Sequence, residues 1–217
     1  MAAVQITTYD QLCAASADWL NRQDLVDQIP AFITLSTAQF NRELRLRDMM
    51  VRADATSSNE NVDLPDDWLE HYSLVVAPGS PPPTGGWGNP VLRYMSERES
   101  NELKQQLYGA TGPVRGYTII GSMIELVPAP ADDVNLKMVY YARIPDLGPS
   151  NQSNWLLARS PDLYLYSTLM QAAPYLKDDD RLGTWVQVRQ AIIDGMRLES
   201  EAAMRPRSGL VSRAKAF

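Results

Sequence analysis

The sequence predicts an α+β protein with a helical bundle formed by an N-terminal and a C-terminal helix pair, a β-rich insertion between them, and an extended C-terminal tail. Apolar residues recur at helical spacing near both ends, whereas the middle consists of short β-prone runs separated by glycine and proline. The last residues are basic and include no acid. We therefore expect the bundle over 1–53 and 150–203, the insertion over 54–149 and the tail over 204–217.

Two helices are expected before the insertion. The first begins at Thr8, because Thr8 and Gln11 have the spacing of a capping box, in which each side chain bonds the other residue's backbone N–H. The second begins between Asp27 and Pro30, since proline is tolerated in the first turn of a helix. The buried face of this second helix is expected to carry Ile33, Thr37, Phe40 and Leu44.

The middle of the chain has the pattern of a β-sheet. The segment from Asp54 to Asp63 is polar and is expected to be a mobile connection. Gly121 and Ser122 fit a two-residue hairpin turn, and Pro128–Asp133 is expected to form a second hairpin loop. Strands are expected at Trp68–Val76, Val91–Met95, Tyr117–Ile120, Met123–Val127 and Asn135–Tyr141.

Two further segments of the insertion have distinct compositions. Ser96 and Glu99 form a second capping box and predict a short helix over Glu97–Leu107. Residues 78–90 are so rich in proline and glycine that neither a helix nor a central strand is expected. They are interpreted as a mobile linker or as a contact loop, in which Trp87 would meet a neighbour on the tail side.

The last third is expected to be helical again. Ser160 followed by Pro161 and Asp162 combines an N-cap, a first-turn proline and an acid that favours the helix dipole. Pro174 should kink or end that helix. The three acids of Asp178–Asp180 are expected to cap the final long helix, whose apolar face includes Trp185.

Composition excludes several classes of function. The single cysteine, Cys13, cannot form an intrachain disulfide, and Cys13 and the single histidine, His71, are too few for an ordinary zinc site. Both are interpreted as structural residues. No apolar run is long enough to span a bilayer, and the N-terminus does not have the pattern of a signal peptide. We expect no catalytic residue, no metal and no cofactor.

Paired carboxylates offer the one enzymatic alternative. Asp66 with Asp132 or Asp133 would supply the acid and base of a glycan hydrolase. The structural interpretation is simpler. Asp66 precedes a strand, and Asp132 and Asp133 lie in a loop.

The basic end of the chain is the strongest candidate for a binding site. A solvated end, a nucleic-acid contact and a docking arm all remain open, and an arm that orders on binding suits the alternating small residues. The residues expected to dock are Arg205, Arg207, Leu210, Arg213, Lys215 and Phe217.

An ordered series of segments resembles the head-to-tail adaptor family of tailed phages. The segments are Trp19–Leu25, Ile29–Ile33, Phe40–Arg45, Leu64–Leu69, Gly116–Ile119, Val139–Pro145, Asn154–Leu157, Pro161–Tyr166 and Ala172–Leu176. The resemblance implies a virion protein made in the host cytoplasm that forms a ring, twelve-membered in that family. The ring would bind the portal protein on one side and a tail nozzle or tail-fibre protein on the other.

The same resemblance implies that the C-terminal segment docks on the portal and that the family has no catalytic residues to transfer. Net charge of −6 disfavours a general nucleic-acid-binding surface and suits a channel through which DNA passes without specific binding. A capsid or tail-completion protein of another connector layer is the third alternative. No membrane is expected among the partners.

Overall fold

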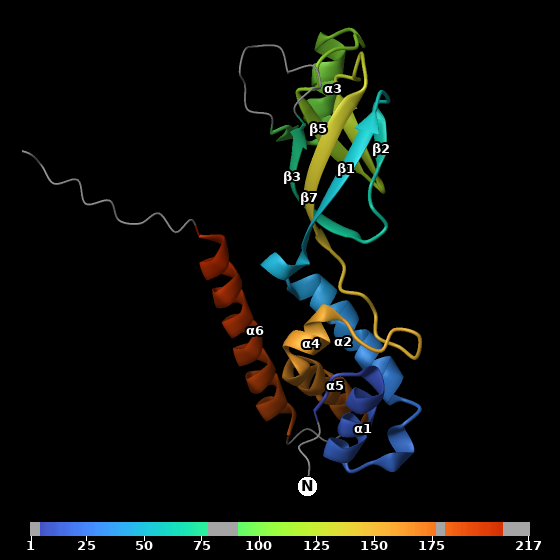
Figure 1. The fold of residues 1–217 in the computed structure, drawn as a ribbon, viewed down its shortest axis with the longest axis vertical. Coiled ribbons are helices and arrows are strands. Elements are labelled where there is room, and N and C mark those ends of the chain that lie inside the picture. Colours follow the sequence, from blue (N-terminus) through green and yellow to red (C-terminus); the bar gives the residue numbers. More distant parts are fainter. Residues whose placement is uncertain (1–4, 78–90, 177–180, 206–217) are drawn as a thin grey trace, which may run out of the picture. The chain divides into compact units, whose positions relative to one another are not determined.

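The computed structural model describes residues 5–77, 91–176 and 181–205, and Figure 1 shows its helices and strands. The chain divides into two compact units. Residues 1–48 and 144–217 belong to a helical unit, and residues 49–143 belong to a β-rich unit. The predicted α+β fold class is confirmed, because the described residues contain helices and two β-sheets.

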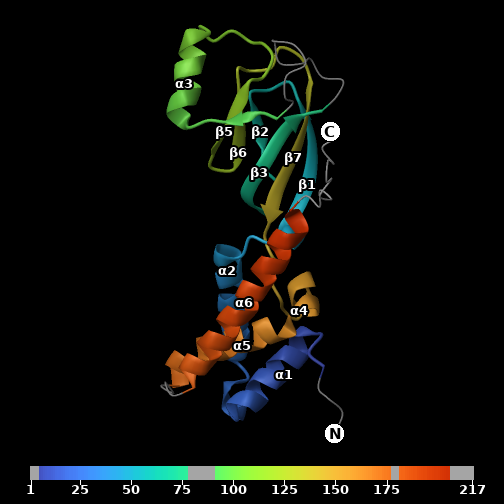
Figure 2. The ribbon, with the colours of Figure 1, turned by 90° about the vertical axis from the view of Figure 1, so that its left-hand side faces the viewer.

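In the helical unit, the other helices pack around α5 (Pro161–Leu176). Its neighbours are α1 (Tyr9–Leu20), α2 (Ile29–Glu43), α4 (Trp155–Arg159) and α6 (Leu182–Met204), as Figure 2 also shows. Short 3-10 turns cover Gln23–Leu25 and Arg47–Met49. The fully buried side chains of this unit include Leu12, Ile29, Ile33, Phe40, Leu44, Leu156 and Tyr164.

The local signals at the starts of α1 and α2 are confirmed, whereas the hydroxyl of Ser160, the predicted N-cap of α5, donates to Met196 Sδ and Ser160 is the C-cap of α4. Thr8 and Gln11 form the predicted capping box at α1, and Pro30 lies in the first turn of α2. Pro174 lies inside α5, two residues before its end. Residues 178–180, the predicted cap of the last helix, all lie outside the described residues, and the N-cap of α6 is Arg181, which the prediction did not name.

The β-rich unit contains two sheets. One has the antiparallel order β1 (Met50–Ser57), β7 (Val134–Ala142), β3 (Trp68–Val76). The other has the order β2 (Asn61–Asp63), β6 (Met123–Val127), β5 (Gly116–Ile120), β4 (Arg93–Tyr94). Helix α3 (Glu97–Gln106) follows β4 and begins with the predicted Ser96–Glu99 capping box.

Side chains from both sheets form one apolar core. Leu74, Leu136 and Met138 come from the first sheet, and Tyr117 and Leu126 come from the second. Along β7 the buried Val134, Leu136 and Met138 alternate with the less buried Asn135, Lys137 and Val139, the period of two that a sheet with one covered face requires.

The prediction of a mobile connection over Asp54–Asp63 is wrong. Asp54 lies within β1, which pairs with β7 along its whole length, and residues 61–63 form β2. Every second side chain of β1 from Ala53 to Ser57 is partly buried, and the Thr56 hydroxyl donates to Asn135 Oδ1 at 2.6 Å. The polar residues lie on the solvent face of a strand that pairing with β7 stabilises. The low hydrophobicity of this segment therefore did not indicate a loop.

One hairpin is confirmed and the other is wrong. Ile120 pairs with Met123, and Gly121 has φ 63, which glycine adopts without steric cost. By contrast, β6 and β7 do not pair with each other, since they lie in different sheets. Residues 128–133 therefore connect the two sheets, and Asp132 and Asp133 do not lie in a hairpin loop.

Candidate docking surface and candidate catalytic groups

Arg205 is the one predicted docking residue that the structure describes. It is the C-cap of α6, with φ −68 and ψ 130, and its backbone N–H donates to the Glu201 carbonyl at 3.1 Å. The extended conformation follows from Pro206, because a residue before proline is pushed out of the helical region. The basic segment therefore leaves the helix at a defined residue.

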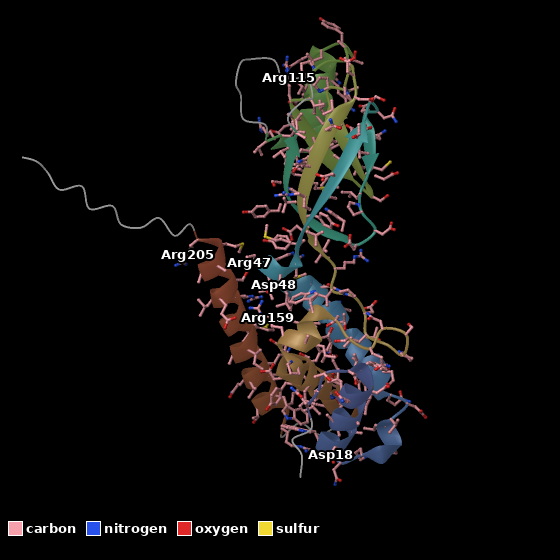
Figure 3. The ribbon with its side chains drawn as sticks, viewed as in Figure 1. Asp18, Arg47, Asp48, Arg115, Arg159 and Arg205 are labelled. Carbon is pink, nitrogen blue, oxygen red and sulfur yellow. The ribbon has the colours of Figure 1, made fainter. Side chains whose placement is uncertain are left out.

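The C-terminal half of α6 is held firmly in the helical unit. The Ser200 hydroxyl accepts a hydrogen bond of 2.8 Å from the backbone N–H of Arg47. Arg159 forms ion pairs with Asp48 and with Glu199, the latter at 3.0 Å, and Figure 3 shows Arg159 beside Asp48. Glu199 and Ser200 lie in the last two turns of α6, so these contacts hold the helix close to Arg205.

A buried cation fastens the middle of α6 to α2 and α5. Arg189, with a side chain only 6% exposed, donates to Glu43 Oε2 at 2.6 Å and to the Ser167 hydroxyl at 3.1 Å. Its guanidinium also lies 5.9 Å from the centre of the Phe40 ring. A buried charge needs such partners because desolvation would otherwise disfavour it. Sequence reasoning missed this group, since Glu43 and Arg189 are 146 residues apart.

The pKa of Glu43 should make stability depend on pH. Burial raises the pKa of its carboxyl, but hydrogen bonds from Arg189 and Gln39, with the charges of Arg189 and Arg197, lower it below the usual value overall. A depressed pKa stabilises the folded state above the unfolded pKa of about 4.3, and this contribution disappears as the pH falls through the folded pKa.

We expect Glu43→Gln to lower the free energy of unfolding most near neutral pH, with the deficit shrinking in acid. Urea unfolding at a series of pH values, followed by far-UV circular dichroism, measures this difference. In an Arg189→Met background the same substitution should lose most of its pH dependence. A deficit that stays constant between about pH 7 and about pH 3 would contradict the assignment.

The carboxylates of the hydrolase alternative do not form a pair. Trp68 pairs with Ala142, so Asp66 lies at one end of β7, whereas Asp132 and Asp133 precede its other end. The 9 residues of β7 separate them by about 30 Å, at a rise of roughly 3.3 Å per residue. Glycosidases place their two carboxyls within about 10 Å. This geometry does not support the alternative of a hydrolase site.

Asp67 already has a structural partner. Its carboxylate accepts a hydrogen bond of 2.8 Å from the Tyr140 hydroxyl. Burial, with the nearby Asp67, raises the pKa of Tyr140 to about 12, so this hydroxyl stays a donor at neutral pH. The contact fastens the segment before β3 to β7.

His71 and Cys13 both pack as structural residues. The His71 ring stacks on Tyr94 with centres 4.5 Å apart and meets Tyr117 edge-on at 6.0 Å. Burial raises the pKa of the Cys13 thiol, which disfavours the nucleophilic thiolate. The two residues lie in different units.

A small cavity lies among strands of both sheets of the β-rich unit. Its volume is about 190 Å³, and most of its lining is apolar, with Asp54 and Asp63 also contributing. In the described ranges no three His, Cys, Asp or Glu side chains gather as a metal site would require. No described helix is long and apolar enough to cross a membrane.

The other predicted site residues fall outside the described residues. They are Trp87, Arg207, Leu210, Arg213, Lys215 and Phe217. The structure thus describes the helix that carries the docking segment, and the docking role of these residues stays a prediction.

Comparison with known proteins gives one family. The family model described as SU10 adaptor protein matches residues 7–211, nearly the whole chain. A search of curated proteins gave no match. The family match confirms the resemblance to phage head-to-tail adaptors.

Proposed function

Because the chain belongs to the SU10 adaptor protein family, we propose that it joins the portal to the tail of a phage particle, as one copy in a ring. The observation that carries the proposal is the family match, which extends over both structural units. An adaptor family gives the chain a structural role in a virion, in association with other virion components. The ring, the portal contact and the passage of DNA are the proposed details.

The docking arm is proposed to be the basic segment that follows α6. Arg189 and Ser200 anchor the helix, and the chain leaves it at Arg205. Beyond that point the sequence is basic with apolar residues interspersed, a composition suited to a segment that orders on its partner. We propose that Arg205, Leu210 and Phe217 belong to this contact.

The remaining contacts follow from the same role. The helical bundle would form the ring, and Trp87 of the insertion would meet the tail nozzle, a tail-fibre protein or a neighbouring copy. An overall charge of −6 would let DNA slide past without binding, since like charges discourage phosphate contacts.

The solution mass of the chain, alone and mixed with the portal protein of the same phage, tests the proposal. We expect a monomer that becomes a ring-sized complex only with the portal, because a docking arm that orders on its template couples assembly to binding. Light scattering after size-exclusion chromatography measures both states. A chain whose mass is unchanged by the portal would overturn the portal contact, and hydrolysis assays on glycans would then be the next step.

A further inference from the structure

The ring of the proposed function needs two different surfaces on each copy, because head-to-tail contacts are heterologous. We propose that these surfaces are the outward faces of α2 and α6, with α2 of one copy packing in parallel against α6 of the next. The inference rests on the proposed function and names its contact between copies. Both faces belong to the helical unit.

The outward face of α6 carries one large exposed apolar side chain among small residues. The side that packs on the unit carries Trp185, Arg189, Ile193, Met196 and Ser200. On the opposite side Leu198 is 67% exposed, which is unfavourable for a large apolar side chain that meets only water. The exposed residues in line with it are Ala191, Gly195 and Ala202.

Helix α2 has a similar outward face. Phe32, Ile33 and Phe40 face the core, whereas Leu35 on the other side is 52% exposed. The exposed residues in line with Leu35 are Ala31, Ala38 and Arg42. Each helix therefore buries one side against its own unit and leaves a second apolar side without a partner among the described residues.

The two faces match in spacing and in size. On each face, successive residues are four, three and four positions apart in the sequence. This is the spacing of the a and d positions by which helices pack side by side. In a parallel alignment Leu35 of one copy meets Gly195 of the next, and Leu198 meets Ala38. Each large side chain then lies against a small one, which lets the helices approach closely.

Charge favours the same alignment. Arg42 is exposed and pairs with no carboxylate in the described ranges, and it would lie opposite Ala202. Glu199 and Glu201 lie near Ala202 on the helix; Glu199 also pairs with Arg159 at 3.0 Å, and Glu201 has only a loose 3.6 Å contact with Arg205. The arrangement brings an exposed cation of one copy beside two acids of its neighbour.

The direction of the helices allows a cyclic arrangement. Glu43, at the end of α2, contacts Arg189 and Arg197 of α6, and Arg47 farther along contacts Ser200. The two helices therefore run the same way within one copy. Rotation about an axis along them preserves that direction, so parallel pairing can repeat around a ring.

A weak contact between copies would explain why the proposed ring forms only on the portal. One pair of helices buries less than the roughly 1,600 Å² of a standard stable interface. Two free copies should thus associate weakly, and the contact should close when the portal holds the copies side by side.

Disulfide cross-linking on the assembled complex tests the inference. The Leu35→Cys, Gly195→Cys variant, in a Cys13→Ala background, should give a ladder of linked copies after oxidation and denaturing electrophoresis. A Cβ at Gly195 meets nothing within 4 Å, so the variant should fold. A disulfide needs Cα atoms within about 7 Å, a distance that the proposed register provides.

The matched control carries Leu35→Cys with Gly183→Cys. Gly183 is also exposed, lies on the same helix and has open space for a Cβ, but it is about 18 Å farther along the axis. It should give no ladder. Ala38→Cys with Leu198→Cys is a second test pair for the same register.

The outcomes separate the inference from the proposed function. Ladders from both test pairs and none from the control support the α2–α6 contact. A ring-sized complex without those ladders, or with equal ladders from the control, overturns the contact while the adaptor role stands. Failure of the unmodified chain to form a ring-sized complex with the portal overturns both.

Discussion

Deletion of residues 205–217 is expected to weaken binding to the portal by at least about 100-fold, equivalent to roughly 2.7 kcal/mol. The deleted segment carries four basic residues and no acid, with Leu210 and Phe217 as apolar anchors. A few such side chains supply most of the binding energy in protein interfaces. The change should thus remove the contact without a general loss of structure.

The helical unit should tolerate this deletion. Arg189, Met196 and Ser200 hold α6 upstream of the cut, and Arg205 itself contributes an exposed 3.6 Å ion pair with Glu201 and one backbone hydrogen bond at the helix end. Portal binding measured by surface plasmon resonance, with the melting temperature as a check on folding, tests the expectation. A folded, truncated chain that binds as tightly as the full chain would exclude the docking arm.

A matched variant separates charge from apolar contact in the arm. Replacing Arg207, Arg213 and Lys215 with glutamine keeps the length and the apolar residues of the segment. If the portal contact is chiefly electrostatic, this variant should bind nearly as poorly as the truncated chain, and binding by the full chain should weaken with added salt. Retained binding would assign the contact to Leu210 and Phe217.

Tyr164→Ala is expected to lower the free energy of unfolding of the helical unit by about 3–5 kcal/mol. Tyr164 is fully buried in α5, and its ring meets Phe40 edge-on with centres 5.0 Å apart. Its hydroxyl accepts a hydrogen bond of 2.8 Å from Asn154, the residue that caps α4. The substitution leaves a cavity where α2, α4 and α5 meet.

Urea unfolding followed by far-UV circular dichroism measures the effect, because the helices supply most of that signal. Tyr164→Phe is the matched control, since it keeps the ring and removes only the hydroxyl. Asn154 would still donate to the Pro145 carbonyl at 2.7 Å, so the control should cost only about 1 kcal/mol. Similar losses from the two variants would contradict a packing role for the ring.

The sequence by itself determined the features that depend on neighbours along the chain. Thr8 with Gln11 and Ser96 with Glu99 cap their helices as predicted, and Gly121 turns the hairpin between β5 and β6. These motifs act over three or four residues, so their geometry follows from local backbone preferences. The ordered segments that resemble phage adaptors likewise indicate the family from the sequence, and the family model matches residues 7–211.

Only the tertiary structure decided which strands pair and which charges meet. Residues 54–63 have the composition of a polar connection, but pairing with β7 makes the first of them part of strand β1. Strands β6 and β7 are consecutive in the chain, yet they lie in different sheets. Glu43 and Arg189, 146 residues apart, form one buried contact, whereas Asp66 and Asp133 are held at opposite ends of β7. Such arrangements depend on the free energy of packing whole elements together, and local periodicity carries no information about which distant element will be the partner.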